Sequence, residues 1–154
     1  MNQIATKYFG QLAYTEDSVV EFPDGIPGFE DQHGFVIVQQ PATRPLVFLQ
    51  SLTKPELCFT TVPAQAACPD YRLSIPCEDL AALELPSGRQ PEIGRDVLCL
   101  TVISVGDDAS VTANLLAPLV VNIQTRRGRQ PIMVESEYSH RHPLDAPREA
   151  AQCS

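Results

Sequence analysis

Two histidines near the C-terminal end have a spacing at which side chains can chelate a metal ion. His140 and His142 flank Arg141, and on a strand both imidazoles would point to the same face. No carboxylate or thiolate pattern around them completes a ligand set, and the adjacent arginine opposes a bound cation. The third histidine, His33, stands alone near an expected turn. The sequence therefore predicts neither a metal site nor a bound cofactor.

The cysteines do not form a recognisable zinc or redox motif. No two of them are close in the sequence, and the C-x-x-C spacing is absent. We expect free thiols that serve as small apolar side chains. The five cysteines are Cys58, Cys68, Cys77, Cys99 and Cys153.

The sequence also lacks the motifs of nucleophilic and phosphate chemistry. It has no G-x-S-x-G elbow, and no histidine can be paired with a cysteine as a catalytic partner. Gly25 and Gly28 do not have the G-x-G-x-x-G spacing of a phosphate-binding loop. Glu78, Asp79 and Glu84 are expected on one short helix, where a solvated acidic face accounts for them. We predict a binding protein without catalytic residues rather than an enzyme.

A basic turn is the remaining candidate for chemistry. Arg126, Arg127 and Arg129 surround Gly128, and on a β-barrel such a patch would suggest a single-strand nucleic-acid binder. No aromatic side chain is interleaved with the arginines, and the net charge of -8 has the wrong sign for neutralising phosphates. Two interpretations stay open: a solvated turn, and a contact for an acidic protein surface. We expect no direct binding to nucleic acid.

The elements that must position these residues are organised around 97–123. Val97–Val105 is a run of β-branched and aliphatic residues, and a second apolar run follows the loop at 106–110. We predict a long antiparallel hairpin whose first strand is apolar on both faces and needs cover on both. Pro118 cannot donate to a ladder, so it predicts a bulge, a bend or a strand start.

The rest of the chain consists of short apolar runs separated by turn residues. Strands or alternating segments are expected at 3–9, 11–14, 19–22, 35–38, 46–49, 57–62, 71–75 and 131–134, with a short helix at 76–84. Tight turns at 23–25 and 27–28 predict a stiff apolar knuckle around Ile26 and Phe29. This pattern predicts an all-β fold.

We expect a single antiparallel β-barrel-like domain over residues 1–144, with one or two short helices. Residues 145–154 are expected to form a flexible C-terminal tail. The chain of 154 residues suits one domain, and no run approaches the ~20 apolar residues of a spanning helix. Its N-terminus lacks the pattern of a signal peptide. We therefore expect a cytoplasmic protein with no membrane partner.

The segment 22–30, with sequence FPDGIPGFE, resembles the flagellar assembly factor family FliW. Further matching motifs follow in order along the chain. They are LQS at 49–51, PELCF at 55–59, PDY at 69–71, DVL at 96–98, ANLLAPLVVN at 113–122, GRQ at 128–130 and YSHRHPL at 138–144. The resemblance covers essentially residues 4–144, and so many motifs in register make it specific.

The resemblance implies a small non-enzymatic protein that binds flagellin in the cytoplasm and also binds CsrA, an RNA-binding translational regulator. The resemblance implies that flagellin and CsrA share the factor in a partner switch. Factor that is free of flagellin binds CsrA and prevents it from repressing the flagellin message, so that translation resumes. This antagonism is noncompetitive in the family, because the factor binds CsrA away from its RNA surface. Acidic groups near an RNA path would repel phosphate within ~8 Å at physiological salt. We hypothesise that Glu78, Asp79 and Glu84 act in this way.

Several residues are candidates for partner contacts. They are Ile26, Phe29, Glu78, Asp79, Arg129, Tyr138 and Arg141. For Ile26 and Phe29 the competing interpretation is packing of a rigid turn. For Tyr138 and Arg141 it is anchoring of the tail. A small β-barrel that binds a ligand or single-stranded nucleic acid is the alternative function.

One segment departs from the family pattern. Where the family usually carries aromatic residues just before Pro69, this chain has the small side chains of Ala64–Cys68. Small side chains remove the anchors that usually dominate an interface. If this segment contacts a partner, we expect affinity or partner choice to differ here. Asn114 and Asn122 are expected to satisfy backbone groups at the irregularity near Pro118.

Overall fold

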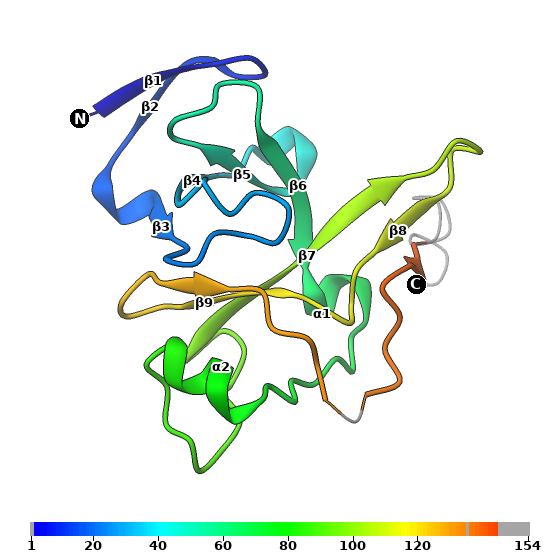
Figure 1. Ribbon diagram of the computed structural model, residues 1–154. Helices are drawn as coiled ribbons and strands as arrows, with labels where there is room; N and C mark the ends of the chain where they lie inside the picture. Colours follow the sequence, from blue (N-terminus) through cyan, green and yellow to red (C-terminus); the bar gives the residue numbers. More distant parts are fainter. Residues whose placement is uncertain (1, 135, 145–154) are drawn as a thin grey trace.

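One large antiparallel sheet forms most of the structure (Figure 1). The computed structural model describes residues 2–134 and 136–144. The main path through the sheet has the strand order β10-β9-β7-β6-β5-β4-β3. These strands are β3 (Val19–Glu21), β4 (Gly34–Val38), β5 (Val47–Ser51), β6 (Cys58–Pro63), β7 (Val97–Val105), β9 (Leu119–Asn122) and β10 (Gly128–Arg129).

Two more strands extend the sheet along β7. β8 (Val111–Ala113) pairs with the C-terminal part of β7, and β11 (His142–Pro143) pairs with β8. The N-terminal part of β7 pairs with β9, so one long strand carries two shorter ones in turn. Residues 114–118 separate these two, and β9 begins directly after Pro118. The predicted antiparallel pairing and the strand start after the proline are confirmed.

The remaining elements are short. β1 (Asn2–Thr6) and β2 (Gly10–Tyr14) form a separate hairpin, as the sequence predicts. The hairpin is fastened to the β5–β6 loop, because the Lys7 N–H donates to the Pro55 carbonyl at 2.9 Å. The short helices are η1 (Glu16–Ser18), η2 (Pro41–Thr43), α1 (Ala64–Ala67) and α2 (Cys77–Ala82). No helix within the described ranges is long and apolar enough to cross a membrane.

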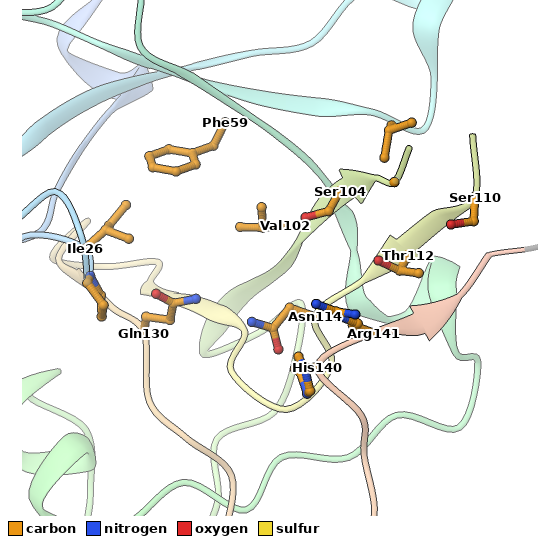
Figure 2. A pocket seen from close by; sticks show the side chains of 13 residues that line it. Ile26, Phe59, Val102, Ser104, Ser110, Thr112, Asn114, Gln130, His140 and Arg141 are labelled. Atoms are coloured by element: carbon orange, nitrogen blue, oxygen red, sulfur yellow. The ribbon is translucent and has the colours of Figure 1, made fainter. Parts of the chain in front are cut away.

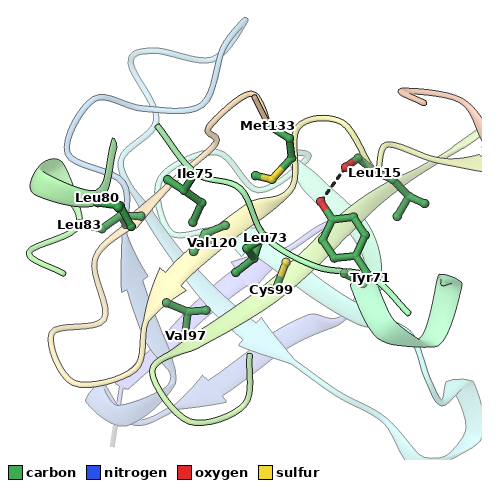
Figure 3. Packing of buried hydrophobic residues seen from close by; sticks show 11 residues of the cluster. Tyr71, Leu73, Ile75, Leu80, Leu83, Val97, Cys99, Leu115, Val120 and Met133 are labelled. Atoms are coloured by element: carbon green, nitrogen blue, oxygen red, sulfur yellow. Dashed lines mark hydrogen bonds between the residues drawn. The ribbon is translucent and has the colours of Figure 1, made fainter. Parts of the chain in front are cut away.

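Apolar side chains cover the sheet on both faces. One cluster, which we name the sheet core, contains Val20, Phe22, Ile26, Phe35, Val47, Leu49, Leu100, Leu119 and Val121. The other, the helix-side core, contains Ala64, Tyr71, Leu73, Ile75, Leu80, Leu83, Val97, Cys99, Leu115, Val120 and Met133 (Figure 3). Leu100 and Cys99 are neighbours on β7, belong to different cores, and are 0% and 1% exposed. The expectation that this strand needs cover on both faces is confirmed.

The two ends of the sheet approach each other without closing into a barrel. In the described part of the chain no ladder joins β3 to β10. One isolated parallel bridge links Glu21 to Arg127, and the Glu21 N–H donates to the Arg126 carbonyl at 2.9 Å. Here a Cβ on Gly128 would lie 2.7 Å from the Phe22 ring, so only glycine fits without a shift. The antiparallel β fold with short helices is confirmed, whereas a closed barrel is not found.

Residues 131–134 do not form the predicted strand. The Met133 N–H donates to the Leu116 carbonyl at 2.9 Å, and the Val134 N–H donates to the Ser74 carbonyl at 3.0 Å. Because these acceptors lie on different segments, the residues do not share one ladder partner. Met133 is nevertheless buried in the helix-side core.

Other segments also differ from expectation. Residues 64–67, where the sequence has no clear period, form α1, and β10 lies inside the expected basic turn at 125–130. The alternation at 71–75 is visible as burial of every second side chain, although the segment pairs with no strand. The tail predicted at 145–154 lies outside the described residues, and the domain boundary at 144 stays a prediction.

Candidate functional site

The knuckle at residues 22–30 has the two turns that its prolines and glycines predict. Gly25 and Gly28 have φ angles of +73° and +91°, which side chains disfavour, and a Cβ on Gly25 would lie 2.5 Å from the Glu30 Cα. The Phe29 N–H donates to the Ile26 carbonyl at 2.6 Å. Backbone contacts therefore define the shape of this loop, and the two predicted turns are confirmed.

The two apolar side chains of the knuckle are held by packing. Ile26 is 3% exposed and belongs to the sheet core. Phe29 is half-buried and packs edge-on against Phe59 of β6, with ring centroids 5.3 Å apart. These contacts favour the packing interpretation for Ile26, while Phe29 keeps part of its surface open.

A groove of about 510 Å³ separates the knuckle from the β7–β8 hairpin (Figure 2). Its apolar wall consists of Ile26, Phe59 and Val102, and Val105 continues it at the end of β7. The other lining residues are Pro27, Ser104, Gly106, Ser110, Thr112, Asn114, Gln130, His140 and Arg141. The groove therefore combines an apolar side with a side rich in hydrogen-bond donors, which suits a binding surface.

The irregular backbone between β8 and β9 forms one border of this groove. The Asn114 side-chain oxygen accepts the Ala117 N–H at 3.0 Å, and the Gln130 amide nitrogen donates to the Ala117 carbonyl at 2.9 Å. The expectation that Asn114 satisfies backbone near Pro118 is confirmed. Asn122 does not bond to the backbone near Pro118. Its amide nitrogen instead donates to the carbonyl of Leu83, the residue that follows α2, at 2.8 Å.

A buried ion pair lies next to the groove. Arg129 of β10 donates to the Asp79 carboxylate of α2 and to the Asp24 carboxylate of the knuckle. Asp79 is 8% exposed, and its hydrogen bond is the largest cause that raises the pKa of the Arg129 guanidinium. One arginine thus joins three elements that are far apart in the sequence. These contacts tie the knuckle to α2 and β10.

The other arginines of the basic turn are also paired within the chain. Arg126 lies 4.0 Å from the Asp17 carboxylate, and Arg127 lies 4.0 Å from the Glu84 carboxylate. Both pairs are largely exposed and contribute little stability. The turn is therefore solvated and neutralised by carboxylates of the same chain.

The acidic residues around α2 do not share one solvated face. Glu78 and Glu84 are exposed, whereas Asp79 points inward to Arg129. The expectation of a common solvated face is therefore wrong for Asp79. The reason is that Arg129, which follows 50 residues later, supplies a charge partner at the buried side of the helix.

The C-terminal segment is anchored by a tyrosine pair. The rings of Tyr138 and Tyr71 lie 4.4 Å apart, and the Tyr138 hydroxyl accepts the Arg72 N–H at 2.9 Å. Tyr71 donates to the Leu115 carbonyl at 2.6 Å, and burial raises the pKa of its hydroxyl (Figure 3). These contacts favour the anchoring interpretation for Tyr138. Arg141, in contrast, is exposed at the groove.

The cysteines and histidines of the described residues belong to no metal-binding group. Cys58, Cys68, Cys77 and Cys99 are free thiols, as predicted, and burial raises the pKa of Cys99 to about 12. Across residues 2–134 and 136–144 no group of three side chains could hold a metal ion. Cys153 lies outside these ranges.

Comparisons with known proteins decide the family. The family model described as FliW protein matches residues 3–144, which is nearly all of the domain described above.

The chain belongs to the FliW family.

Similar FliW proteins cover almost the whole chain. The flagellar assembly factor FliW of Syntrophomonas wolfei is 33% identical over 151 residues, which cover 97% of this chain and 93% of that protein. The FliW of Desulfitobacterium hafniense is 37% identical over 142 residues, or 92% of this chain and 90% of that protein. A crystal structure of the flagellar assembly factor FliW matches with a TM-score of 0.80 and 32% identity, covering 94% of this chain and 98% of that one.

Membership in the FliW family agrees with the predicted lack of catalysis. FliW proteins are non-enzymatic assembly factors, so this chain is not an enzyme. The segment 64–68, which is expected to depart from the family pattern, contains α1. The exposed residues of that helix are Gln65 and Ala66, so the surface there carries no large apolar anchor.

Sequence reasoning located some of the groove residues and missed others. Arg141, Ile26 and Asn114 were singled out by motif or spacing, whereas Val105 and Thr112 were not. The two missed residues lie on the β7–β8 hairpin, which reads as uniformly buried in the sequence. In the structure Val105 is 69% exposed, because the pairing of β7 with β6 ends at Val102 and only β8 accompanies β7 as far as Val105.

Proposed function

We propose that this FliW-family protein is a cytoplasmic flagellar assembly factor that binds flagellin and antagonises CsrA. Factor free of flagellin would bind CsrA and relieve repression of flagellin translation. The observation that supports this most strongly is the family match over residues 3–144, since it spans both cores, the knuckle and the groove. Relatives with the same description cover more than nine-tenths of the chain.

The surface chemistry is compatible with two protein partners. The groove offers apolar and donor groups to one ligand. The chain as a whole has 19 acidic and 11 basic residues, and this acidic balance would attract a basic partner such as an RNA-binding regulator. Among the carboxylates of the earlier hypothesis, Glu78 and Glu84 are exposed and can act on such a partner or its RNA. Asp79 acts only by holding Arg129 in place.

A three-component binding experiment tests this proposal. The purified protein is passed over a size-exclusion column with flagellin, with CsrA, and with both together, all from the same organism. We expect co-elution with each partner alone and displacement of CsrA by flagellin. Binding to neither partner would refute the function, and binding to flagellin alone would remove the regulatory half.

The noncompetitive mechanism needs its own measurement. CsrA is titrated with a flagellin leader RNA at several fixed concentrations of this protein. We expect a lower maximum of RNA binding that excess RNA does not restore. The variant Glu78→Gln/Glu84→Gln should weaken this effect if repulsion of phosphate contributes. If that variant antagonises CsrA as well as the wild type does, the hypothesis of phosphate repulsion is wrong, whereas the noncompetitive mechanism is unaffected.

The alternative function, direct binding of single-stranded nucleic acid, has less support. The three arginines that suggested it are each paired with a carboxylate of the same chain. A direct RNA binder would show an affinity that falls steeply with salt when this protein is titrated alone. We expect no such binding.

A further inference from the structure

The groove differs in charge from the rest of the protein. The chain as a whole carries 19 acidic residues and a net charge of -8. Among the described residues that line the groove, however, there is no aspartate or glutamate, and Arg141 and His140 stand at one end. An acidic protein thus keeps one recess free of carboxylates and gives it a cation.

Arg141 is in a different situation from the arginines of the basic turn. Each of those has a carboxylate partner, whereas none of the ion pairs between described residues includes Arg141. The Asn114 amide nitrogen likewise has no acceptor in the described part of the chain, since only its oxygen is used. Figure 2 shows Arg141 and Asn114 close together at one border of the groove. Both groups are available as donors to a ligand.

The opposite border of the groove is apolar. Phe59 and Val102 are half-buried, and Val105 exposes 69% of its surface at the end of β7. A volume of about 510 Å³ accommodates a few side chains rather than a whole domain face. The groove is therefore suited to anchoring one short segment within a larger interface.

We propose that this groove binds a segment of flagellin in which an apolar side chain lies next to a carboxylate. The carboxylate would accept hydrogen bonds from Arg141 and Asn114, and the apolar side chain would pack on Phe59 and Val102. This inference rests on the proposed function and assigns one of its two partners to a site. An RNA-binding regulator offers cationic surface for phosphates, so it fits the acidic remainder of the protein better than this groove.

The sign of one charge in the groove tests the proposal directly. Val105→Glu and Val105→Lys both place a long charged side chain at the same exposed position, and both remove the same apolar surface. Flagellin affinity is measured by calorimetry at low and physiological salt, with CsrA affinity as the internal reference. We expect Val105→Glu to weaken flagellin binding about tenfold more than Val105→Lys at low salt, with a smaller difference at higher salt.

A second pair of variants tests the cation. Arg141→Glu should weaken flagellin binding by about tenfold or more, whereas Arg44→Glu, a matched exposed arginine outside the groove, should leave it unchanged. CsrA binding should stay within about twofold of wild type for all four variants. Thermal melts confirm that each variant is folded.

Several outcomes would overturn the proposal. If wild type binds flagellin but the four variants bind it equally well, the proposed function stands and the groove assignment falls. If CsrA binding is lost instead, the groove belongs to the other partner. If Arg141→Glu strengthens flagellin binding and Asp145→Asn/Glu149→Gln has the same effect, the groove holds the chain's own acidic tail. Failure of wild type to bind either partner would refute the proposed function itself.

Discussion

We predict that removing the Arg129 side chain lowers the stability of the fold and leaves the binding of partners unchanged. Arg129 joins β10 to the Asp79 carboxylate of α2 and to the Asp24 carboxylate of the knuckle. In Arg129→Ala both hydrogen bonds are lost, and the Asp79 carboxylate, whose side chain is 11% exposed in the intact protein, loses its counter-charge. A buried carboxylate without a partner is costly, so the stability of the domain should fall.

The exposures of the three side chains set the expected magnitudes. Loss of one partner from a fully buried ion pair costs about 3–5 kcal/mol, but 29% of the Arg129 side chain reaches solvent. We therefore expect about 2 kcal/mol for Arg129→Ala, which corresponds to a fall in Tm of about 4–8 °C for a domain of this size. Asp79→Asn keeps an acceptor and should cost about 1 kcal/mol. Asp24→Asn, at a carboxylate that is 73% exposed, should cost less than about 0.5 kcal/mol.

Urea denaturation at fixed pH and salt measures these differences. The order expected for the loss of stability is Arg129→Ala, then Asp79→Asn, then Asp24→Asn. The double variant Arg129→Ala/Asp79→Asn should be more stable than the sum of its single effects predicts, because neither residue then leaves an unpaired charge. An Arg129→Ala protein with wild-type stability and lost flagellin binding would refute this reasoning and make Arg129 a partner contact.

Single contacts set the expected effects of three further perturbations. Gly128→Ala should lower the free energy of unfolding by about 1–3 kcal/mol in the same urea assay, because the new Cβ would lie 2.7 Å from the Phe22 ring. An unchanged urea midpoint would mean that the two ends of the sheet separate easily. An alkylating reagent added to the folded protein at pH 8 should modify the exposed Cys77, as detected by mass spectrometry. It should spare the buried Cys99, whose pKa is raised to about 12, until urea unfolds the chain. Equal rates of alkylation at the two cysteines would contradict the burial of Cys99. Tyr138→Phe loses the hydrogen bond from the Arg72 N–H and should lower the stability by about 1 kcal/mol. Tyr138→Ala also loses the contact with the Tyr71 ring, so thermal melts should show a loss of stability at least twice as large.

The sequence determined the local structure of this protein. The sequence predicts the strands up to β6, the long strand β7 and the helix α2 at their observed positions. These elements are predictable because apolar periodicity and turn residues depend on only a few neighbouring positions. The knuckle was also predictable, since the prolines and glycines of residues 22–30 specify their own turns. The family motifs added the identity of the domain, which local rules alone do not give.

The errors occurred where the backbone bonds to more than one segment. Residues 131–134 have the composition of a strand, but their amides donate to Leu116 and Ser74, which belong to different parts of the chain. The sequence predicts a turn where β10 lies, because Gly128 and Arg129 become a strand only through their pairing with β9. A ladder is a property of two segments, so one segment's residue types do not decide it.

Only the tertiary structure decided which side chains are free to bind. Arg129 and Arg141 are both arginines in family motifs, yet one is paired with a carboxylate that precedes it by 50 residues and the other faces the groove. The groove itself combines the knuckle, β6, the β7–β8 hairpin and the C-terminal segment. Contacts between distant residues depend on how the sheet brings its strands together, and no local pattern records that arrangement. The sequence thus specified the elements, and the fold specified the surface.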